Sequence, residues 1–188
     1  RISSTLYTVQ NKSGAAPTAF TANSKYRIYR AYTSLFDAER GVENSAITAI
    51  DATLGNFDTW TNGRDLVANS EQWNITLYGG RSADSTYTDI NGWTTSAEAN
   101  LKIYTPTNSH EVGISQRHPG YYTNLSYENT GSIGVTSNFV TIDGVQIHFV
   151  GTGSGLHNAG IYSMSGSATA VTKILNSIIF LQSGSSGL

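Results

Sequence analysis

A pattern of two short apolar runs, separated by a single Gly or Asn, occurs twice near the C-terminal end of the sequence, at 139–147 and 170–179. The copies align with an offset of 32 residues, which matches Ile142 with Ile174, Gly144 with Asn176 and Ile147 with Ile179. Side chains alternate between the two faces of a strand, so the isoleucines of each copy would share one buried face. Gly and Asn accept the left-handed backbone that a sharp corner requires. Strands that repeat at this interval, with loops between them, predict a β-solenoid.

Similar strands precede the repeat. Trp73–Tyr78 and Leu101–Thr105 alternate apolar and polar residues, and Ile75 lies 28 residues before Ile103. We therefore expect three regions, which are an extended N-terminal arm at 1–24, a capping region at 25–72, and a β-helix at 73–188 with a loop insertion at 106–130.

A short helix is expected within the capping region. Ser34 and Asp37 form an S-x-x-D capping pattern, and Gly41 follows as a C-terminal stop. Leu35 and Phe36 would then lie over one end of the solenoid.

Composition excludes several classes of function. The net charge is −2 and no cluster of Lys and Arg occurs, so the basic face that nucleic-acid binding needs is missing. The chain has no cysteine, which excludes disulfides and sites built on Cys. No apolar run approaches the roughly 18 residues of a membrane span.

Candidate acids for catalysis are few. Hydrolysis of a polysaccharide requires two carboxylates that flank the scissile bond. Asp143 is the only acid inside a repeat, and its place before Gly144 is typical of a turn. Asp84, Asp89 and Glu98 form a more plausible acidic group, although such residues more often lie in solvated loops and turns.

Metal and cofactor motifs are incomplete. His110 and Glu111 begin an H-E-x-x-H pattern, but Ile114 occupies the position of the second histidine. His148 and His157 flank one loop, where isolated histidines are usually surface residues. We therefore expect no metal and no cofactor, and we favour a protein that is not an enzyme.

Two sets of residues are candidate contacts. Trp93, Arg117, Tyr121 and Tyr122 offer aromatic faces and a charge to a glycan or a protein partner, unless the tyrosines pack the 106–130 insertion onto the solenoid. The second set is apolar and lies near the C-terminal end, where no capping element follows: Ile178, Ile179, Phe180 and Leu181. A solenoid end left uncovered exposes strand edges, so we expect a neighbouring subunit to cover this set, in a ring such as a trimer or in a filament. Replacing Ile178 and Phe180 with Asp would then break the assembly.

Two segments carry a resemblance to a known family. They are Ala31–Glu39, with the sequence AYTSLFDAE, and a series that begins with DINGWTTS at Asp89 and ends with VTIDGVQI at Val140–Ile147. Together they resemble the pectate-lyase-like right-handed β-helix proteins of phages and environmental bacteria, over Lys25 to Phe180. The resemblance implies an all-β, right-handed parallel β-helix whose N-terminal capping segment contains a short helix. Members of this family include virion decoration, fibre and tailspike proteins as well as polysaccharide lyases.

These observations favour a structural component of an extracellular assembly, with a phage virion surface as the expected setting. Its expected partners are copies of itself and other virion or surface proteins. Two alternatives remain open, which are a polysaccharide-binding or depolymerising protein of tailspike type and a bacterial adhesin or filament subunit.

Overall fold

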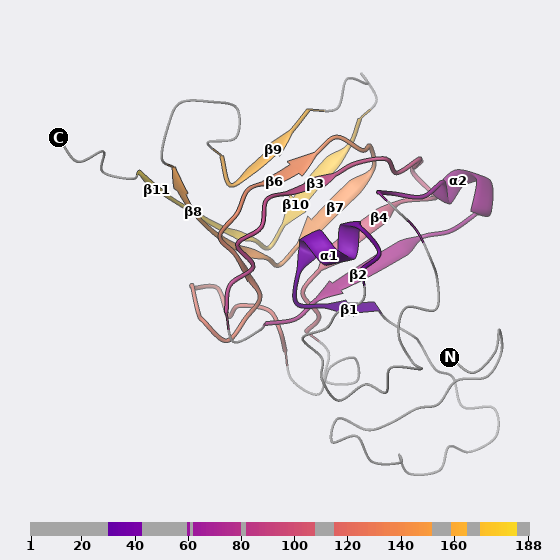
Figure 1. The fold of residues 1–188 in the computed structure, drawn as a ribbon. Coiled ribbons are helices and arrows are strands. Elements are labelled where there is room, and N and C mark those ends of the chain that lie inside the picture. Colours follow the sequence, from indigo (N-terminus) through magenta and orange to yellow (C-terminus); the bar gives the residue numbers. More distant parts are fainter. Residues whose placement is uncertain are drawn as a thin grey trace, which may run out of the picture.

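The computed structural model describes residues 30–42, 60, 62–79, 82–107, 115–151, 159–164 and 170–183. These residues form mainly β-strands in three sheets, with two short helices, and every strand pair is parallel (Figure 1). The described part of the chain is therefore all-β in class, as the sequence predicts. The expected N-terminal arm at 1–24 lies outside the described residues.

The largest sheet has five strands in the order β1-β2-β4-β7-β10. In chain order these strands are β1 (Arg30–Tyr32), β2 (Trp73–Leu77), β4 (Leu101–Tyr104), β7 (Val140–Asp143) and β10 (Thr172–Leu175). Because β1 pairs with β2, a strand of the expected capping region belongs to the same sheet as the later repeats.

Two smaller sheets have three strands each. The first has the order β3-β6-β9, with β3 at Thr88–Ile90, β6 at Ile133–Val135 and β9 at Ile161–Ser163. The second has the order β11-β8-β5, with β5 at Glu128–Asn129, β8 at Gln146–Gly151 and β11 at Ile178–Ser183. From β3 onward the chain visits the β6 sheet, the five-stranded sheet and the β8 sheet in turn, and it repeats this order up to β11.

The strand register confirms the alignment predicted from the sequence. Ile174 pairs with Ile142, and Ile179 pairs with Ile147, at the offset of 32 residues. The earlier match of Ile75 with Ile103 is confirmed as well. At the corner between the two strands of each copy, Gly144 has a φ of 80° and Asn176 a φ of 46°. Both corners thus have the left-handed backbone for which Gly and Asn are suited.

The core is formed by side chains on the inward faces of the three sheets. The cluster includes large residues that are completely buried, among them Ile75, Ile90, Leu101, Ile103, Ile133 and Ile142. Alternation along each strand accounts for this, since every second side chain faces the same side of its sheet.

The predicted short helix is confirmed as α1 (Leu35–Glu39). The side chain of Ser34 accepts a hydrogen bond from the Asp37 backbone N–H, and Gly41 follows with a φ of 65°. Leu35 and Ala38 are completely buried, and α1 packs against β1 and β3 (Figure 1). Each of those strands is the first in its sheet, so α1 covers the edge of two sheets.

The second helix, α2 (Leu66–Asn69), was not anticipated from the sequence. Asp65 caps it by accepting a hydrogen bond from the Ala68 backbone N–H at 2.8 Å. Within the described ranges, neither helix has the length and apolar character needed to cross a membrane.

Candidate interaction site at the open edge

The strands β9, β10 and β11 each terminate a sheet. Each pairs with an earlier strand on one side and with no described strand on the other. We call their unpaired side the open edge; the three strands appear in orange to yellow in Figure 1. Backbone N–H and C=O groups along such an edge can pair with a further strand.

Three apolar side chains at the open edge share the inward face of their sheets and are nevertheless exposed. The register places Ile174 on Ile142, Ile179 on Ile147 and Leu181 on Phe149. In the preceding strands, Ile142 is 0% exposed and Ile147 is 1% exposed. By contrast, Ile174 and Ile179 are each 44% exposed, and Leu181 is 58% exposed. The difference in exposure arises from the neighbouring strands. Ile142 and Ile147 have a paired strand on each side, whereas the open-edge residues have a described strand on one side only.

The structure places all four predicted interface residues on β11. They divide between its two faces, because Ile179 and Leu181 follow the inward pattern while Phe180 faces outward and is 52% exposed. Ile178 is partly buried and pairs with Gln146. Their contact with a partner stays a prediction, to which the structure adds the position and exposure of each residue.

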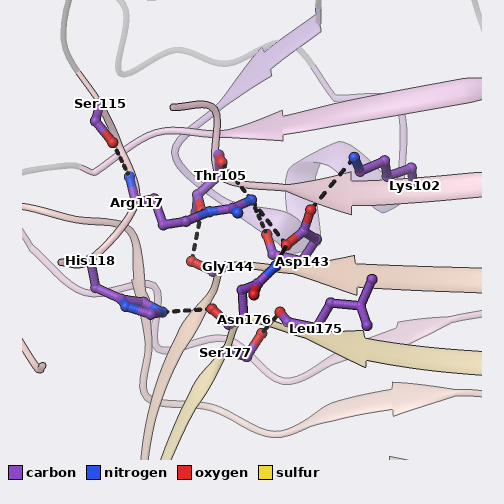
Figure 2. Close-up of polar contacts among 10 residues, drawn as sticks. All are labelled: Lys102, Thr105, Ser115, Arg117, His118, Asp143, Gly144, Leu175, Asn176 and Ser177. Atoms are coloured by element: carbon purple, nitrogen blue, oxygen red, sulfur yellow. Dashed lines mark hydrogen bonds and ion pairs between the residues drawn. The ribbon is translucent and has the colours of Figure 1, made fainter. Parts of the chain in front are cut away.

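A group of polar side chains holds the turn that leads into β11 (Figure 2). Asn176 Nδ2 donates to Asp143 Oδ1 at 2.9 Å, and Arg117 Nη2 lies 3.0 Å from the same oxygen. Lys102 Nζ lies 3.5 Å from Asp143 Oδ2. Thr105 completes this group, which we call the Asp143 bracket, by accepting a hydrogen bond from Arg117 Nη2 through its backbone oxygen at 3.2 Å. The bracket therefore joins the corner of the last repeat to three earlier segments of the chain.

The ionisation of Asp143 matches this structural role. Burial raises its pKa, but the hydrogen bond from Asn176 and the charges of Arg117 and Lys102 outweigh burial, so the pKa lies below 3.8. Asp143 is therefore a carboxylate at neutral pH, and it lies at a turn as the sequence predicts.

Arg117 was a candidate for glycan or partner contact, and the structure places it in the Asp143 bracket. Its guanidinium is only partly exposed and contacts Asp143 and Thr105. The next residue, His118, has its Nε2 2.8 Å from the backbone oxygen of Asn176 (Figure 2). The segment at 115–120 thus ties the polar insertion to the corner before β11.

A row of exposed rings crosses the outer face of the β8 sheet. The Tyr122 ring lies edge-on to His148 at 6.1 Å between centroids, and His148 lies edge-on to Phe180 at 5.1 Å. Tyr122 donates its hydroxyl to Glu128 Oε1 at 2.6 Å, and His148 Nδ1 lies 3.7 Å from that oxygen. The hydrogen bond to Glu128 raises the pKa of Tyr122 to about 12. We call these four residues the aromatic row.

The two remaining candidates for surface contact differ in exposure. Tyr121 is 68% exposed, which suits a contact residue. Trp93 requires a correction, because its side chain is only 5% exposed and its ring packs against Trp73 in the core. A glycan has no exposed indole face on which to stack at this position.

The three acids considered for catalysis each have local structural partners. Asp84 is buried and accepts hydrogen bonds from the Leu35 backbone N–H at 2.7 Å and from the Tyr127 hydroxyl at 2.8 Å. Asp89 Oδ1 accepts from Thr136, and Glu98 Oε2 accepts from Ser96. Among the residues that the structure describes, no three His, Asp or Glu side chains are grouped so as to hold a metal ion.

Sequence reasoning missed Glu39, a buried acid at the last position of α1. Its carboxyl oxygens accept hydrogen bonds from the Asn91 backbone N–H at 2.9 Å and from Trp93 Nε1 at 2.9 Å. Burial raises the pKa of Glu39 to about 8, although these two hydrogen bonds act to lower it. A signal was present, because Glu39 lies four positions after Leu35, and residues at that spacing share one face of a helix.

The contact of His148 with Tyr122 was also missed. The sequence marks His148 only as a possible metal ligand together with His157, which lies outside the described residues. The alternation of β8 contains the relevant signal, since His148 follows the inward Ile147 and must face outward.

Comparison with known proteins found no matching family model, no matching curated protein and no matching solved structure. The open edge, the Asp143 bracket and the aromatic row are therefore the observations on which a function can be argued.

Proposed function

We propose that the three sheets are the faces of a right-handed parallel β-helix. The fixed order in which the chain visits the sheets from β3 to β11 supports this proposal, as does the parallel pairing throughout. The right hand follows from the twist of strands, because crossovers between parallel strands are right-handed in nearly all proteins.

We propose that the protein is a non-enzymatic structural component of an extracellular assembly, and that it associates with copies of itself through the open edge. The setting that we propose is a phage virion surface, on the strength of the resemblance described above. The main support for self-association is the exposure of Ile174, Ile179 and Leu181, whose side chains lie on the inward face of their sheets. Covering them would remove apolar area from water at a gain of about 25 cal/mol per Å².

The acids support a structural role more than a catalytic one. Asp84 fixes the first residue of α1, and Asp143 fixes the corner before β11. A glycosidase instead needs two carboxylates about 5 to 10 Å apart that face one bound sugar chain. Asp84 and Asp143 instead accept hydrogen bonds from groups of the protein itself, each in a different part of the fold.

The mass in solution, measured by light scattering, tests the proposal. We expect a defined oligomer, and we expect Ile179→Asp to shift it to the monomer because the substitution places a charge on the apolar open edge. Val67→Asp on α2 is the matched control, since Val67 is 45% exposed and Ile179 is 44% exposed. Circular dichroism would show that both variants remain folded. A monomeric wild-type protein, or an oligomer that survives Ile179→Asp, would contradict the proposal.

A polysaccharide-binding protein is the second candidate, and the aromatic row is the observation that favours it. Exposed rings beside a carboxylate are suited to sugar rings, which stack on aromatic faces and donate hydroxyl hydrogen bonds. Electrophoresis through gels that contain neutral or acidic bacterial polysaccharides would show binding as retardation. We would expect Tyr122→Ala to remove the retardation and Tyr87→Ala, at the residue that precedes β3, to retain it. Equal migration with and without polysaccharide would exclude this candidate for the polymers tested.

A further inference from the structure

We propose that the open edge docks against the open edge of a second copy across a two-fold axis, with the two β11 strands antiparallel and centred on Phe180. This inference rests on the proposed function and specifies its partner and geometry. It selects one arrangement from the ring, the filament and the dimer that self-association alone would allow.

The two edges of the sheets differ too much for a simple head-to-tail contact. At the edge formed by β1 and β3, helix α1 covers the strands and buries Leu35 and Ala38 completely. At the open edge no described helix lies over β9, β10 or β11. In a head-to-tail stack, β9 and β10 would meet the two sheet edges that α1 covers. In a two-fold contact the open edge meets an identical open edge.

The charge distribution suits contact between two identical surfaces. In a two-fold interface the same patch is present on both sides, so any charge near the axis faces a like charge. Lys173 is the only charged residue between Ala159 and Ser183. It pairs with Thr141 in the preceding strand, whose side chain does not belong to the buried core, so Lys173 lies on the outward face. The rest of the open edge can meet its copy without repulsion between charges.

The alternation along β11, together with the position of its apolar residues, selects the register of the contact. Residues directly opposite one another in an antiparallel pair have side chains on the same face. With the axis at Phe180, the Phe180 side chains of the two copies are opposite each other on the outer face, and Ile179 lies opposite Leu181 of the second copy on the inner face. An axis between two residues would instead place an inward side chain opposite an outward one. An axis on any one residue keeps inward side chains opposite inward ones, and the axis on Phe180 is the choice that places the two apolar inward residues of β11, Ile179 and Leu181, opposite each other. This register continues the apolar core from one copy into the next.

Disulfide trapping tests this geometry directly, because the chain contains no cysteine of its own. In Phe180→Cys the two thiols would lie opposite each other across the axis, at the Cβ separation of about 4.5–5.5 Å typical of facing residues. We expect mild oxidation with diamide to convert most of this variant into a dimer on a non-reducing gel, and dithiothreitol to reverse it. Val67→Cys, on the exposed face of α2, is the control and should remain monomeric on the same gel.

A double variant keeps the experiment informative if loss of the Phe180 ring disturbs β11. In Ile178→Cys/Gln182→Cys, residue 178 of one copy lies opposite residue 182 of the other, so two bonds would form across the same axis. Efficient cross-linking of either variant supports the two-fold contact. If light scattering shows an oligomer but neither variant cross-links, the two-fold contact is wrong while self-association stands. If the wild-type protein is a monomer, both the contact and the proposed function are wrong.

Discussion

Glu39 lies in the core with its carboxyl group against the indole N–H of Trp93. The indole of Trp60 donates to the backbone oxygen of the same residue at 3.2 Å. Glu39 therefore connects α1 to two tryptophans that are distant in sequence. Because burial disfavours the charged form, the proton on Glu39 is part of what keeps α1 stable.

This arrangement predicts a dependence of stability on pH. The pKa of Glu39 is about 8 in the folded protein and 4.5 in the reference state, so the folded state holds the extra proton between these values. The free energy of unfolding should fall as the pH rises from 4.5 to 8, by up to about 1.4 kcal/mol per pH unit from this group. Urea unfolding at several pH values would measure the slope.

Glu39→Gln is the control for this prediction, because an amide of the same shape has no proton to lose. The variant should lose the part of the slope that Glu39 supplies and should be the more stable protein at pH 8. An unchanged slope in Glu39→Gln would assign the pH dependence to other groups.

Single residues also show where sequence reasoning reached its limit. Trp93 was expected at a surface because an indole suits both a binding face and a core. The partner that decides the matter is Glu39, 54 positions earlier in the sequence, and no local pattern connects the two. The place of Asp143 beside a corner could be predicted because Gly144 is its neighbour in the sequence, whereas its contacts with Lys102, Arg117 and Asn176 could not.

At the scale of elements, the corner between β7 and β8 is tightly enclosed by its neighbours. Gly144 has a φ of 80°, and a Cβ atom at this position would lie 2.2 Å from Arg117 Nε and 2.4 Å from Thr105 Oγ1. A residue with a side chain would therefore have a strained backbone at this position, and its Cβ would displace Arg117 and Thr105 of the Asp143 bracket.

Gly144→Ala should consequently destabilise the protein more than a comparable substitution elsewhere. We expect about 1–2 kcal/mol from the left-handed backbone, with a further 1–3 kcal/mol from overpacking. Gly120→Ala separates the two effects, since Gly120 has a φ of 99° and no atom lies within 4 Å of the added Cβ. Thermal or urea unfolding of both variants would measure the difference. Equal losses of stability in the two variants would show that Arg117 and Thr105 can move away from the added methyl group without loss of folding free energy.

Elements were predictable wherever the repeat kept a constant length. The offsets of 28 and 32 residues placed Ile75 on Ile103 and Ile142 on Ile174. The pairing of β4 with β7 joins Leu101 to Val140, and the polar segment between them lengthens this interval, so a search for equal spacing does not find it. The helix α2 was missed because its four residues are too few to show a helical period.

The whole molecule is asymmetric along the direction in which the strands stack. α1 packs over β1 and β3 at the first edge, whereas β9, β10 and β11 form the open edge at the other. The exposed apolar residues Ile174, Ile179 and Leu181 lie at the open edge. The sequence alone located the apolar residues of β11, but their exposure depends on the fact that β11 is the terminal strand of its sheet.

This asymmetry predicts that stability depends on protein concentration. If the open edge is covered by a second copy, association stabilises the folded state by mass action, and unfolding exposes the edge again. The Tm should therefore rise by several degrees across about a hundredfold range of concentration, because that range corresponds to about 2.7 kcal/mol of association free energy. Ile179→Asp should remove the dependence and leave the low-concentration Tm of the wild type nearly unchanged, since in both cases the edge faces water. A wild-type Tm that is the same at every concentration would mean that the folded state gains nothing from a second copy, and the apolar residues of the open edge would then be tolerated in contact with water.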